Sequence, residues 1–317
     1  MGSTQSFEFE AIYLIIEESK RGQKRVGPSV NKSPRFSVFN NDGEKATALC
    51  AQSLWFHYFL GFRVGIQKGN LMMLSGSFYI AKDRDSRPQG DDSHFICEEK
   101  QTIGLADGVG GWSRQGVDAG VYARELMNNS LLAILTQPER QVDPMKVLDE
   151  AFSKTSAEGS STACIITLQE DNMLHAVNMG DSGFMLISQG AVIYQSPIQQ
   201  HSFNFPYQLG NSVNSNQPWQ AQVIKLAVEP GDVIIAGTDG LFDNLSESQI
   251  LEAAATGIER GLHPEEIAWS VAQQAYHISM DGEAVTPFML ASMMAGKSHI
   301  GGKRDDITVI VSRILDT

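Results

Sequence analysis

The sequence predicts an α+β fold with largely antiparallel sheets. Two pairs of apolar runs are separated only by short turns, at Asp171-Asn172 and at Gln189-Gly190. Connections of this kind join antiparallel strands. The stretches with helical spacing gather after Asp107 and after Asp243 and do not alternate with strands. That layering is typical of α+β folds and not of doubly wound ones.

The elements follow in chain order from periodicity and turn residues. Asp143 and Pro144 have the residue types preferred at the N-cap and at the first position of a helix. One helix-like stretch places Val121, Leu126, Leu131, Leu132 and Leu135 on a shared face. The expected strands are 78–80, 94–97, 103–106, 160–168, 173–179, 184–188, 191–195, 233–236 and 307–314, and the expected helices are 119–135, 145–153, 251–258 and 264–275.

One domain is predicted over residues 76–317, after a poorly defined N-terminal extension over residues 1–75. Within the extension, residues 7–16 are expected to form a strand, and residues 17–45 a loop or a disordered segment. Residues 1–6 fit the N-myristoylation pattern, and the acidic residues nearby argue against an organelle-import signal. No apolar run reaches the roughly 20 residues of a membrane helix, so no transmembrane segment is expected.

The composition excludes several classes of protein. The 24 basic and 37 acidic residues give a formal net charge of −13, which argues against a nucleic-acid partner because phosphates attract basic surfaces. The three cysteines are widely spaced and form no CxxC pair, so neither a zinc knuckle nor a disulfide framework is expected. An acidic protein also repels a phosphate substrate unless metal ions lie between the two.

Acidic residues mark the ends of several predicted strands. Asp107-Gly108 directly follows the strand at 103–106, and the glycine lets another group approach the backbone closely. If the fold gathers such strand ends, the carboxylates need a counter-charge. Similar ends recur at Asp91-Asp92, at Asp181, at Asp239-Gly240 with Asp243, and at Asp305-Asp306.

A divalent cation is the simplest counter-charge for these acids. No histidine or cysteine recurs with them, which argues against zinc and copper, and an oxygen-only site suits Mg²⁺ or Mn²⁺. Two such cations about 4 Å apart can convert a water into hydroxide and neutralise phosphate charge. Two alternatives stay open at this point, a calcium-stabilised loop and plain solvated turns.

Six segments resemble the motifs of the metal-dependent type 2C protein serine/threonine phosphatases (PPM/PP2C family). Each segment is weak alone, but six in family order over about three quarters of the chain form a specific match. Gly111-Trp112, Gln199–Asn204 and Gly301–Asp306 further resemble the PTC7-like branch of the family. The six segments are Gly90–Ser93, Leu105–Gly111, Gly159–Ala163, Asn178–Ser182, Thr238–Asp243 and Asp305–Val309.

This resemblance implies a fold and an activity. The fold would be an αββα sandwich, in which two antiparallel sheets pack face to face with helices outside. A binuclear Mg²⁺ or Mn²⁺ site would lie at one end, and a metal-bridging hydroxide would hydrolyse phosphoserine and phosphothreonine in a phosphoprotein substrate. Two alternatives are kept. The fold could serve as a catalytically inactive binding module, or the substrate could be a small molecule.

The resemblance also implies roles for particular residues, carried over by position. Asp107, Asp239 and Asp305 would be the catalytic metal-binding aspartates. Asp107 would bridge both metals, joined by the carbonyl of Gly108, and Asp91 would hold one metal. Asp239 and Asp305 would hold the other metal.

Further positions match outer parts of the family's site. Asp181 and Asp243 match positions that hold a third, weaker metal in some members. Asp92 and Asp306 would fix metal ligands and waters in place.

The resemblance leaves the phosphate contact and the proton donor less well defined. Arg87 precedes Asp91 by four residues, where some members carry a phosphate-binding arginine, and Arg84 is its rival. Several members have a histidine two residues after the bridging aspartate as a proposed general acid. Here that residue is Val109, which cannot transfer a proton. Either a metal-bound water or another residue would then protonate the leaving group. His201 is one candidate, although a loop histidine bonded to backbone is the more ordinary interpretation.

The remaining expectations concern specificity and location. Residues 198–220 and 281–302 are the candidate specificity loops. The branch suggests mitochondria, and the start of the chain suggests the cytoplasm or a lipid anchor. A monomer is expected.

Overall fold

The computed structural model describes residues 70–83, 85–87 and 89–317, and these residues belong to one compact unit. The predicted strand at 7–16, the loop at 17–45, the N-myristoylation pattern and Arg84 lie outside the described residues. Among the described helices, none has the length and apolar character needed to span a membrane.

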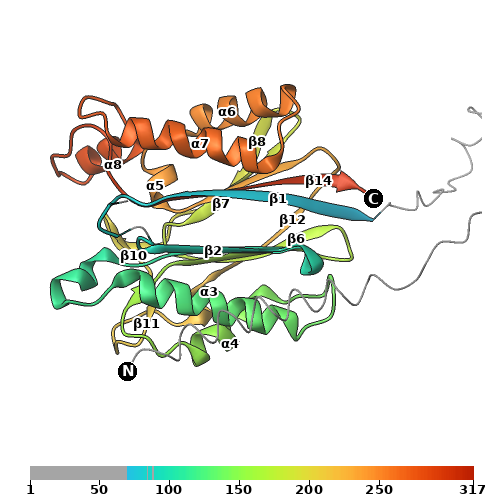
Figure 1. Ribbon diagram of the computed structural model, residues 1–317, viewed down its shortest axis with the longest axis horizontal. Helices are drawn as coiled ribbons and strands as arrows, with labels where there is room; N and C mark the ends of the chain where they lie inside the picture. Colours follow the sequence, from blue (N-terminus) through green and yellow to red (C-terminus); the bar gives the residue numbers. More distant parts are fainter. Residues whose placement is uncertain (1–69, 84, 88) are drawn as a thin grey trace, which may run out of the picture. The chain divides into compact units, whose positions relative to one another are not determined.

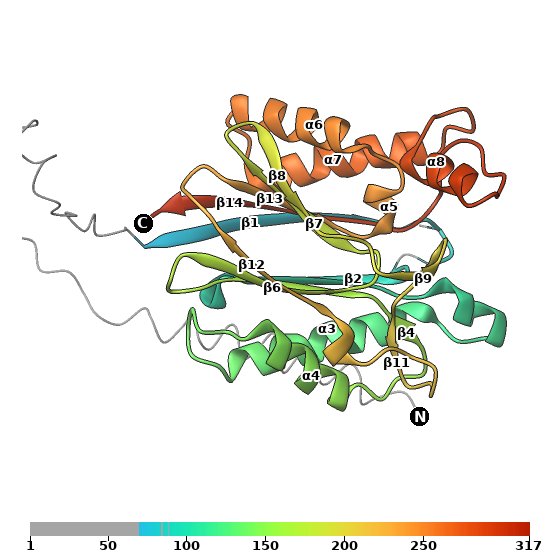
Figure 2. The same ribbon diagram turned by 180° about the vertical axis from the view of Figure 1, so that it is seen from behind.

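The predicted α+β sandwich is confirmed, with two five-stranded antiparallel sheets packed against each other (Figures 1 and 2). The first sheet has the order β1 (Leu71–Ile80), β14 (Ile307–Asp316), β13 (Val233–Gly237), β7 (Gly183–Ser188) and β8 (Ala191–Gln195). The second has the order β12 (Gln222–Ala227), β6 (Met173–Met179), β5 (Ala163–Leu168), β3 (Thr102–Asp107) and β2 (Asp92–Cys97).

Helices cover the outer faces of both sheets. Figure 1 shows α6 and α7 over the first sheet and α3 and α4 over the second. The α-helices are α3 (Ala119–Leu135), α4 (Pro144–Lys154), α5 (Asp239–Phe242), α6 (Glu247–Glu259), α7 (Pro264–Ser279) and α8 (Pro287–Met294). Short elements complete the described chain: η1 (Glu98–Lys100), η2 (Gly110–Gln115), η3 (Pro218–Gln220), β4 (Ser160–Ser161), β9 (Gln200–Ser202), β10 (Phe205–Pro206) and β11 (Leu209–Gly210).

Three apolar layers hold the sandwich together. Between the sheets, Leu105 of the second sheet and Ile310 of the first belong to one buried cluster. Tyr122 of α3 belongs to the layer under α3 and α4, and Val271 of α7 to the layer under α6 and α7. Burial of such side chains contributes roughly 1.5–3 kcal/mol each. The layers fix the sheets, and the sheets fix the strand ends that carry the acids.

The local signals read from the sequence explain several elements. Asp143 caps α4 by accepting hydrogen bonds from the amides of Met145 and Lys146, as predicted. The turn between β7 and β8 places Gln189 at φ 51° and Gly190 at φ 79°, the backbone required by a tight hairpin turn. The hairpin of β5 and β6 is confirmed as well.

The apolar face predicted for α3 is confirmed at Leu126 and Leu131, which pack in the core, and is wrong at Leu132 and Leu135. Leu132 and Leu135 are 42% and 40% exposed, whereas Tyr122, Leu126 and Ile134 are fully buried. The buried face of α3 also includes Tyr122 and small residues such as Ala123 and Ala133, which the spacing of the leucines does not reveal. The helix boundaries themselves agree with the prediction.

Other differences concern elements with weak patterns. β1 begins at Leu71, before the predicted domain start at residue 76. The edge strand β12 was not predicted, because its apolar and polar residues do not alternate strictly; only Ile224 of this strand is buried. The helix α8 was also missed, although Thr286 and Pro287 supply an N-cap and a first helical residue.

Candidate active site

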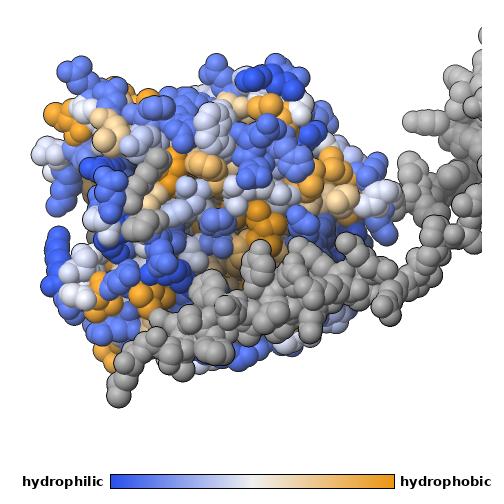
Figure 3. Space-filling model, in the orientation of Figure 1, coloured by the Kyte–Doolittle hydropathy of each residue, from blue (hydrophilic) through white to orange (hydrophobic). Residues whose placement is uncertain are grey.

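A cavity of about 650 Å³ opens where both sheets end beside η2, β10 and α5. Its wall includes Asp107, Asp181, Asp239 and Asp305, which come from separate parts of the sequence. In the space-filling view the left edge of the molecule is indented between the α8 region and the η2 region (Figure 3). The fold therefore gathers four of the predicted acids at one site.

Asp107 is the last residue of β3 and is held by its backbone. Its amide donates to Thr162 Oγ1 at 2.9 Å, and its carbonyl accepts from the amide of Thr162 at 2.9 Å. Its carboxylate has no hydrogen bond or ion pair to any residue that the structure describes. The following Gly108 donates its amide to the carbonyl of Asp91 at 3.1 Å. A β-carbon on Gly108 would lie 2.7 Å from that carbonyl oxygen, so the turn requires glycine.

The second Asp-Gly pair is built in the same way. Asp239 is the first residue of α5 and is 8% exposed. A β-carbon on Gly240 would lie 2.0 Å from the carbonyl oxygen of Asp306, so glycine is required here too. Each Asp-Gly motif thus packs against the backbone of an Asp-Asp motif, which places the acids of both motifs close together.

Asp92 and Asp306 hold parts of the chain together at this end of the sandwich. Asp92 Oδ2 accepts from Thr238 Oγ1 at 2.8 Å and from Thr308 Oγ1 at 2.7 Å. Asp306 accepts from the amides of Lys82 and Asp91 at 2.7 and 2.8 Å. Both carboxylates are buried and face other protein groups, as expected for residues that position metal ligands.

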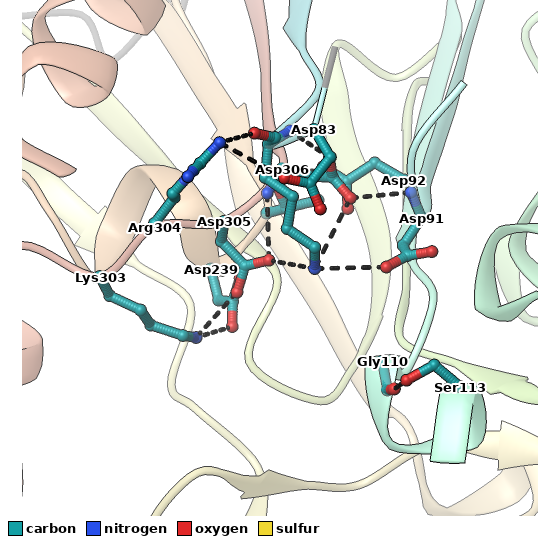
Figure 4. Close-up of polar contacts among 12 residues, drawn as sticks. Asp83, Asp91, Asp92, Gly110, Ser113, Asp239, Lys303, Arg304, Asp305 and Asp306 are labelled. Carbon is teal, nitrogen blue, oxygen red and sulfur yellow. Dashed lines mark hydrogen bonds and ion pairs between the residues drawn. The ribbon is translucent and has the colours of Figure 1, made fainter. Parts of the chain in front are cut away.

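Two lysines lie among the acids. Lys82 Nζ lies 3.0 Å from Asp305 Oδ1 and 3.2 Å from Asp91 Oδ2. Figure 4 shows the carboxylates of Asp91 and Asp305 turned toward each other with this contact between them. Lys303 Nζ contacts Asp239 Oδ2 and lies 3.3 Å from Asp305 Oδ2. Asp305 therefore lies between two ammonium groups.

The site acids differ in their affinity for protons. Burial, and then the charge of Asp239, raises the pKa of Asp107 well above its usual value. The same two causes raise the pKa of Asp181 to about 8. Burial also acts to raise the pKa of Asp305, but the ammonium groups of Lys303 and Lys82 outweigh burial and hold that pKa below its usual value.

The donor set fits a hard cation, with one qualification. Among the described residues, the buried carboxylate oxygens Asp181 Oδ1 and Asp239 Oδ1 on the cavity wall accept no hydrogen bond. Unsatisfied buried oxygens of this kind suit Mg²⁺ or Mn²⁺. Within residues 70–83, 85–87 and 89–317, however, no three acidic, histidine or cysteine side chains converge closely enough to hold a metal as they stand. The lysine ammonium groups lie between the acids instead.

Arg87 is close to the site but not on the wall of the cavity. Its guanidinium contacts Asp91 Oδ1 and lies 3.0 Å from Asp118 Oδ1. The cations on the wall, among the described residues, are Lys82, Arg114 and Lys303. A contact of Arg87 with substrate phosphate stays a prediction.

Val109 and His201 both line the cavity. Val109 precedes η2, and its amide donates to the carbonyl of Ser160 at 2.9 Å. His201 is exposed on β9, and its ring stacks on Tyr207 with centroids 4.3 Å apart. His201 Nε2 bonds to Asn216 Oδ1 at 3.1 Å.

The two candidate specificity loops meet beside the site. Segment 198–220 supplies much of the cavity wall, including Asn204 and Phe205. Segment 281–302 contains α8, whose Phe288 packs against Phe203 with ring centroids 5.0 Å apart. The loops are thus in contact through these two aromatic rings.

The two lysines were not predicted as site residues. A signal was present for Lys303, which lies two residues before the acidic pair Asp305-Asp306. Lys82 follows the end of β1 by two residues and lies nine residues before Asp91 in the sequence. No spacing rule connects such a residue to Asp305, so only the fold reveals the contact.

Comparisons with known proteins place the chain in a family. A family model described as "Stage II sporulation protein E (SpoIIE)" matches residues 98–315. The chain is 48% identical over 244 residues to the probable protein phosphatase 2C 55 of Arabidopsis thaliana, with 77% of this chain and 52% of the relative covered. It is 37% identical over 249 residues to the PTC7 homologue fig of Drosophila mojavensis, with 73% and 80% covered. The chain thus spans about half the length of the Arabidopsis relative.

Solved structures agree with this assignment. The X-ray structure of the photosystem II phosphatase PBCP matches with a TM-score of 0.70 and 29% identity, covering 76% of this chain and 98% of that chain. The catalytic domain of the serine/threonine phosphatase PstP, solved with two manganese ions, shares the fold at a TM-score of 0.54 and 18% identity, covering 78% and 100%. The matched region and the similarity over most of its length show that the chain belongs to the protein phosphatase 2C family.

Proposed function

We propose that this protein is a metal-dependent phosphatase that hydrolyses phosphoserine and phosphothreonine in proteins. The observation that carries the proposal is the convergence of Asp107, Asp239 and Asp305 on one open cavity. They come from β3, from α5 and from the segment before β14. Like charges repel one another at close range unless a counter-charge lies between them. Membership of a family of metal-dependent phosphatases would explain why the fold gathers these three acids.

The carboxylates divide between two proposed cations, Mg²⁺ or Mn²⁺. Asp107 and the carbonyl of Gly108 would contact both cations, and Asp91 would hold one of them. Asp239 and Asp305 would hold the other. The two manganese ions of PstP support a site for two cations.

A third, weaker cation is proposed beside Asp181 and Asp243. Asp181 lines the cavity and has a buried oxygen that accepts no hydrogen bond. Asp243 lies one helical turn after Asp239, and its amide donates to the carbonyl of Asp239 at 2.7 Å. Both acids are therefore placed next to the proposed two-cation site.

Divalent cations bound here would supply a nucleophile from water at neutral pH and would neutralise phosphate charge. The chain's own residues do the remaining work. Asp92 and Asp306 keep the strand ends in register, so that the carboxylates on them stay within reach of each other. Gly108 and Gly240 allow the close backbone packing that this arrangement needs.

The proposal is tested on the purified chain with synthetic phosphopeptides. Phosphate release from phosphoserine and phosphothreonine peptides should require Mn²⁺ or Mg²⁺ and stop with a chelator. Asp239→Asn, which keeps the shape of the side chain, should abolish release. Mn²⁺ binding without any turnover would favour a binding module. Turnover of small phosphate esters but not of phosphopeptides would favour a small-molecule phosphatase.

The proposed phosphate contact of Arg87 has its own test. If the guanidinium leaves Asp91 and Asp118 to bind phosphate, Arg87→Ala should raise KM for the phosphopeptide at saturating Mn²⁺. A change in Mn²⁺ affinity with an unchanged KM would assign Arg87 to the positioning of Asp91. Arg84→Ala serves as the comparison, because Arg84 is the rival for the same role.

A mitochondrial location is proposed from the resemblance to the PTC7-like branch, with the cytoplasm as the alternative. Imaging of the tagged protein in cells distinguishes the two. A monomer is also proposed, and sedimentation of the purified protein tests it.

A further inference from the structure

Lys303 makes an unusual set of contacts for a residue beside a proposed metal site. Its Nζ contacts Asp239 Oδ2, lies 2.6 Å from Asp243 Oδ2 and lies 3.3 Å from Asp305 Oδ2. The Lys303 side chain is only 13% exposed. One ammonium group therefore faces three carboxylates in the position where a cation would be expected.

Hydrogen bonds to its backbone hold Lys303 in this position. Its amide donates to Asn244 Oδ1 at 2.9 Å, and its carbonyl accepts from Asn244 Nδ2 at 2.8 Å. Asn244 is 1% exposed and also donates to the carbonyl of Gly240 at 2.9 Å. The base of Lys303 is thus tied to the segment that carries Asp239.

Packing further limits where the ammonium group can go. The Phe288 ring of α8 lies under it, with Nζ 4.9 Å from the ring centroid. Phe288 is itself 9% exposed and packs against Phe203 and His299. Aromatic faces attract ammonium groups, so the ring stabilises the lysine next to the acids. On its open side, Lys303 lines the cavity.

We propose that Lys303 is a built-in counter-ion that competes with the divalent cation for Asp239, Asp243 and Asp305. Loading of this part of the site is then a cation exchange, in which the ammonium group gives up its carboxylate contacts as the metal takes them. The proposal rests on the metal site of the proposed function and adds to it that metal affinity is set by a residue that is not a ligand.

The charge of Lys303 affects both the metal affinity of the site and the stability of the metal-free protein. A hydrogen bond to a charged group contributes more than a neutral one, and the ammonium group repels a dication that approaches the same carboxylates. In the absence of metal, the lysine keeps the acids from repelling each other. It therefore stabilises the metal-free protein and weakens metal binding.

The first experiment measures Mn²⁺ binding by calorimetry and the unfolding temperature of the chelator-treated full chain. Lys303→Met should tighten Mn²⁺ binding by about tenfold or more, since at least one charge-assisted contact no longer competes. The same variant should lower the unfolding temperature without metal. Lys303→Arg keeps the charge and should bind Mn²⁺ nearly as the wild type does. Lys297→Met, on an exposed site in the neighbouring loop, is the matched control.

The outcomes separate this proposal from the proposed function. Unchanged or weaker Mn²⁺ binding by Lys303→Met, with normal binding by the wild type, overturns the exchange alone. Failure of both proteins to bind Mn²⁺ or Mg²⁺ overturns the proposed function and the exchange with it.

A second measurement does not depend on the folding of a variant. The side-chain amine signal of Lys303 in the wild type, assigned by its loss in Lys303→Arg, should shift in NMR spectra as Mg²⁺ is added. The signal of Lys297 should stay unchanged. A Lys303 signal that stays constant up to saturating Mg²⁺ contradicts the exchange.

Discussion

Thr308 donates a hydrogen bond from Oγ1 to Asp92 Oδ2 at 2.7 Å, and this bond joins two different sheets. Thr308 belongs to β14 of the first sheet and Asp92 to β2 of the second. Thr238 donates to the same oxygen at 2.8 Å from the end of β13. A buried carboxylate thus fixes the distance between the sheet ends that carry Asp107 and Asp239.

Thr308→Val tests this cross-sheet contact. Valine has nearly the same shape, but it cannot donate, so Asp92 loses one of its two threonine partners while buried. The free energy of unfolding should fall by about 1–3 kcal/mol, measured by denaturant titration in the presence of chelator. Thr256→Val, on the exposed face of α6, should change it by less than about 0.5 kcal/mol. Equal effects of the two substitutions would contradict a structural role for the contact.

Gly240→Ala tests the close packing of the two motif types. The added β-carbon would lie 2.0 Å from the carbonyl oxygen of Asp306, so α5 or the Asp306 segment must shift. We expect a loss of about 3 kcal/mol in unfolding free energy and weaker Mn²⁺ binding. At Gly282 a β-carbon meets no atom within 4 Å, so Gly282→Ala should be tolerated. Normal stability of Gly240→Ala would show that the site can relax.

The metal-free protein should lose stability as the pH rises from about 4 to about 8. Burial, and then Asp239, raises the pKa of Asp181 to about 8, and burial raises the pKa of Asp243 to about 7. In the unfolded chain an aspartate has a pKa of about 3.9. Between these values the folded state holds protons that the unfolded state has released, so a higher pH favours unfolding. The lowered pKa of Asp305 acts in the opposite direction and over a lower pH range.

Thermal unfolding with chelator at pH 5.5 and pH 8 checks this expectation. The unfolding temperature should be higher at pH 5.5, and Asp181→Asn should reduce the difference because asparagine does not titrate. Saturating Mn²⁺ should also reduce the difference, since metal replaces protons on the acids. A metal-free protein that is more stable at pH 8 would mean that the two lysines already neutralise the site.

The sequence was informative about the acids because their positions follow from backbone rules. Asp107 ends β3 and Asp239 follows the end of β13 by two residues, and each precedes a glycine that the close backbone packing requires. Asp305 precedes the apolar run of β14. Strand ends at one edge of a sandwich meet in space, so Asp107, Asp181, Asp239 and Asp305 could be predicted to converge.

The lysines and Arg87 could not be placed from the sequence, because long side chains can reach several groups from one backbone position. The Lys303 side chain contacts Asp239, the first residue of α5. Its direction depends on the contact with the Phe288 ring and on the hydrogen bonds between its backbone and Asn244, which the sequence does not reveal. Arg87 reaches Asp91 and Asp118, although its spacing fits a phosphate contact equally well. The edge strand β12 was not predicted for another reason, since its apolar residues do not alternate strictly with polar ones.

His201→Ala should lower activity far less than Asp107→Ala. The His201 ring is exposed, stacks on Tyr207 and bonds to Asn216, so its contacts are those of a residue that shapes the cavity wall. We expect less than about a tenfold loss of kcat, because loss of a general acid costs roughly 10²–10⁴-fold. Asp107→Ala removes a proposed ligand of both cations and should abolish measurable turnover.

The nature of the leaving group distinguishes the roles of His201 more sharply than the size of the loss. The nitrophenolate of p-nitrophenyl phosphate leaves without a proton, whereas the serine oxygen of a phosphopeptide needs one. If His201 shapes the wall, His201→Ala should affect both substrates by a similar factor. A loss of about 100-fold or more on the phosphopeptide, with p-nitrophenyl phosphate hydrolysed normally, would instead make His201 the proton donor that Val109 cannot be.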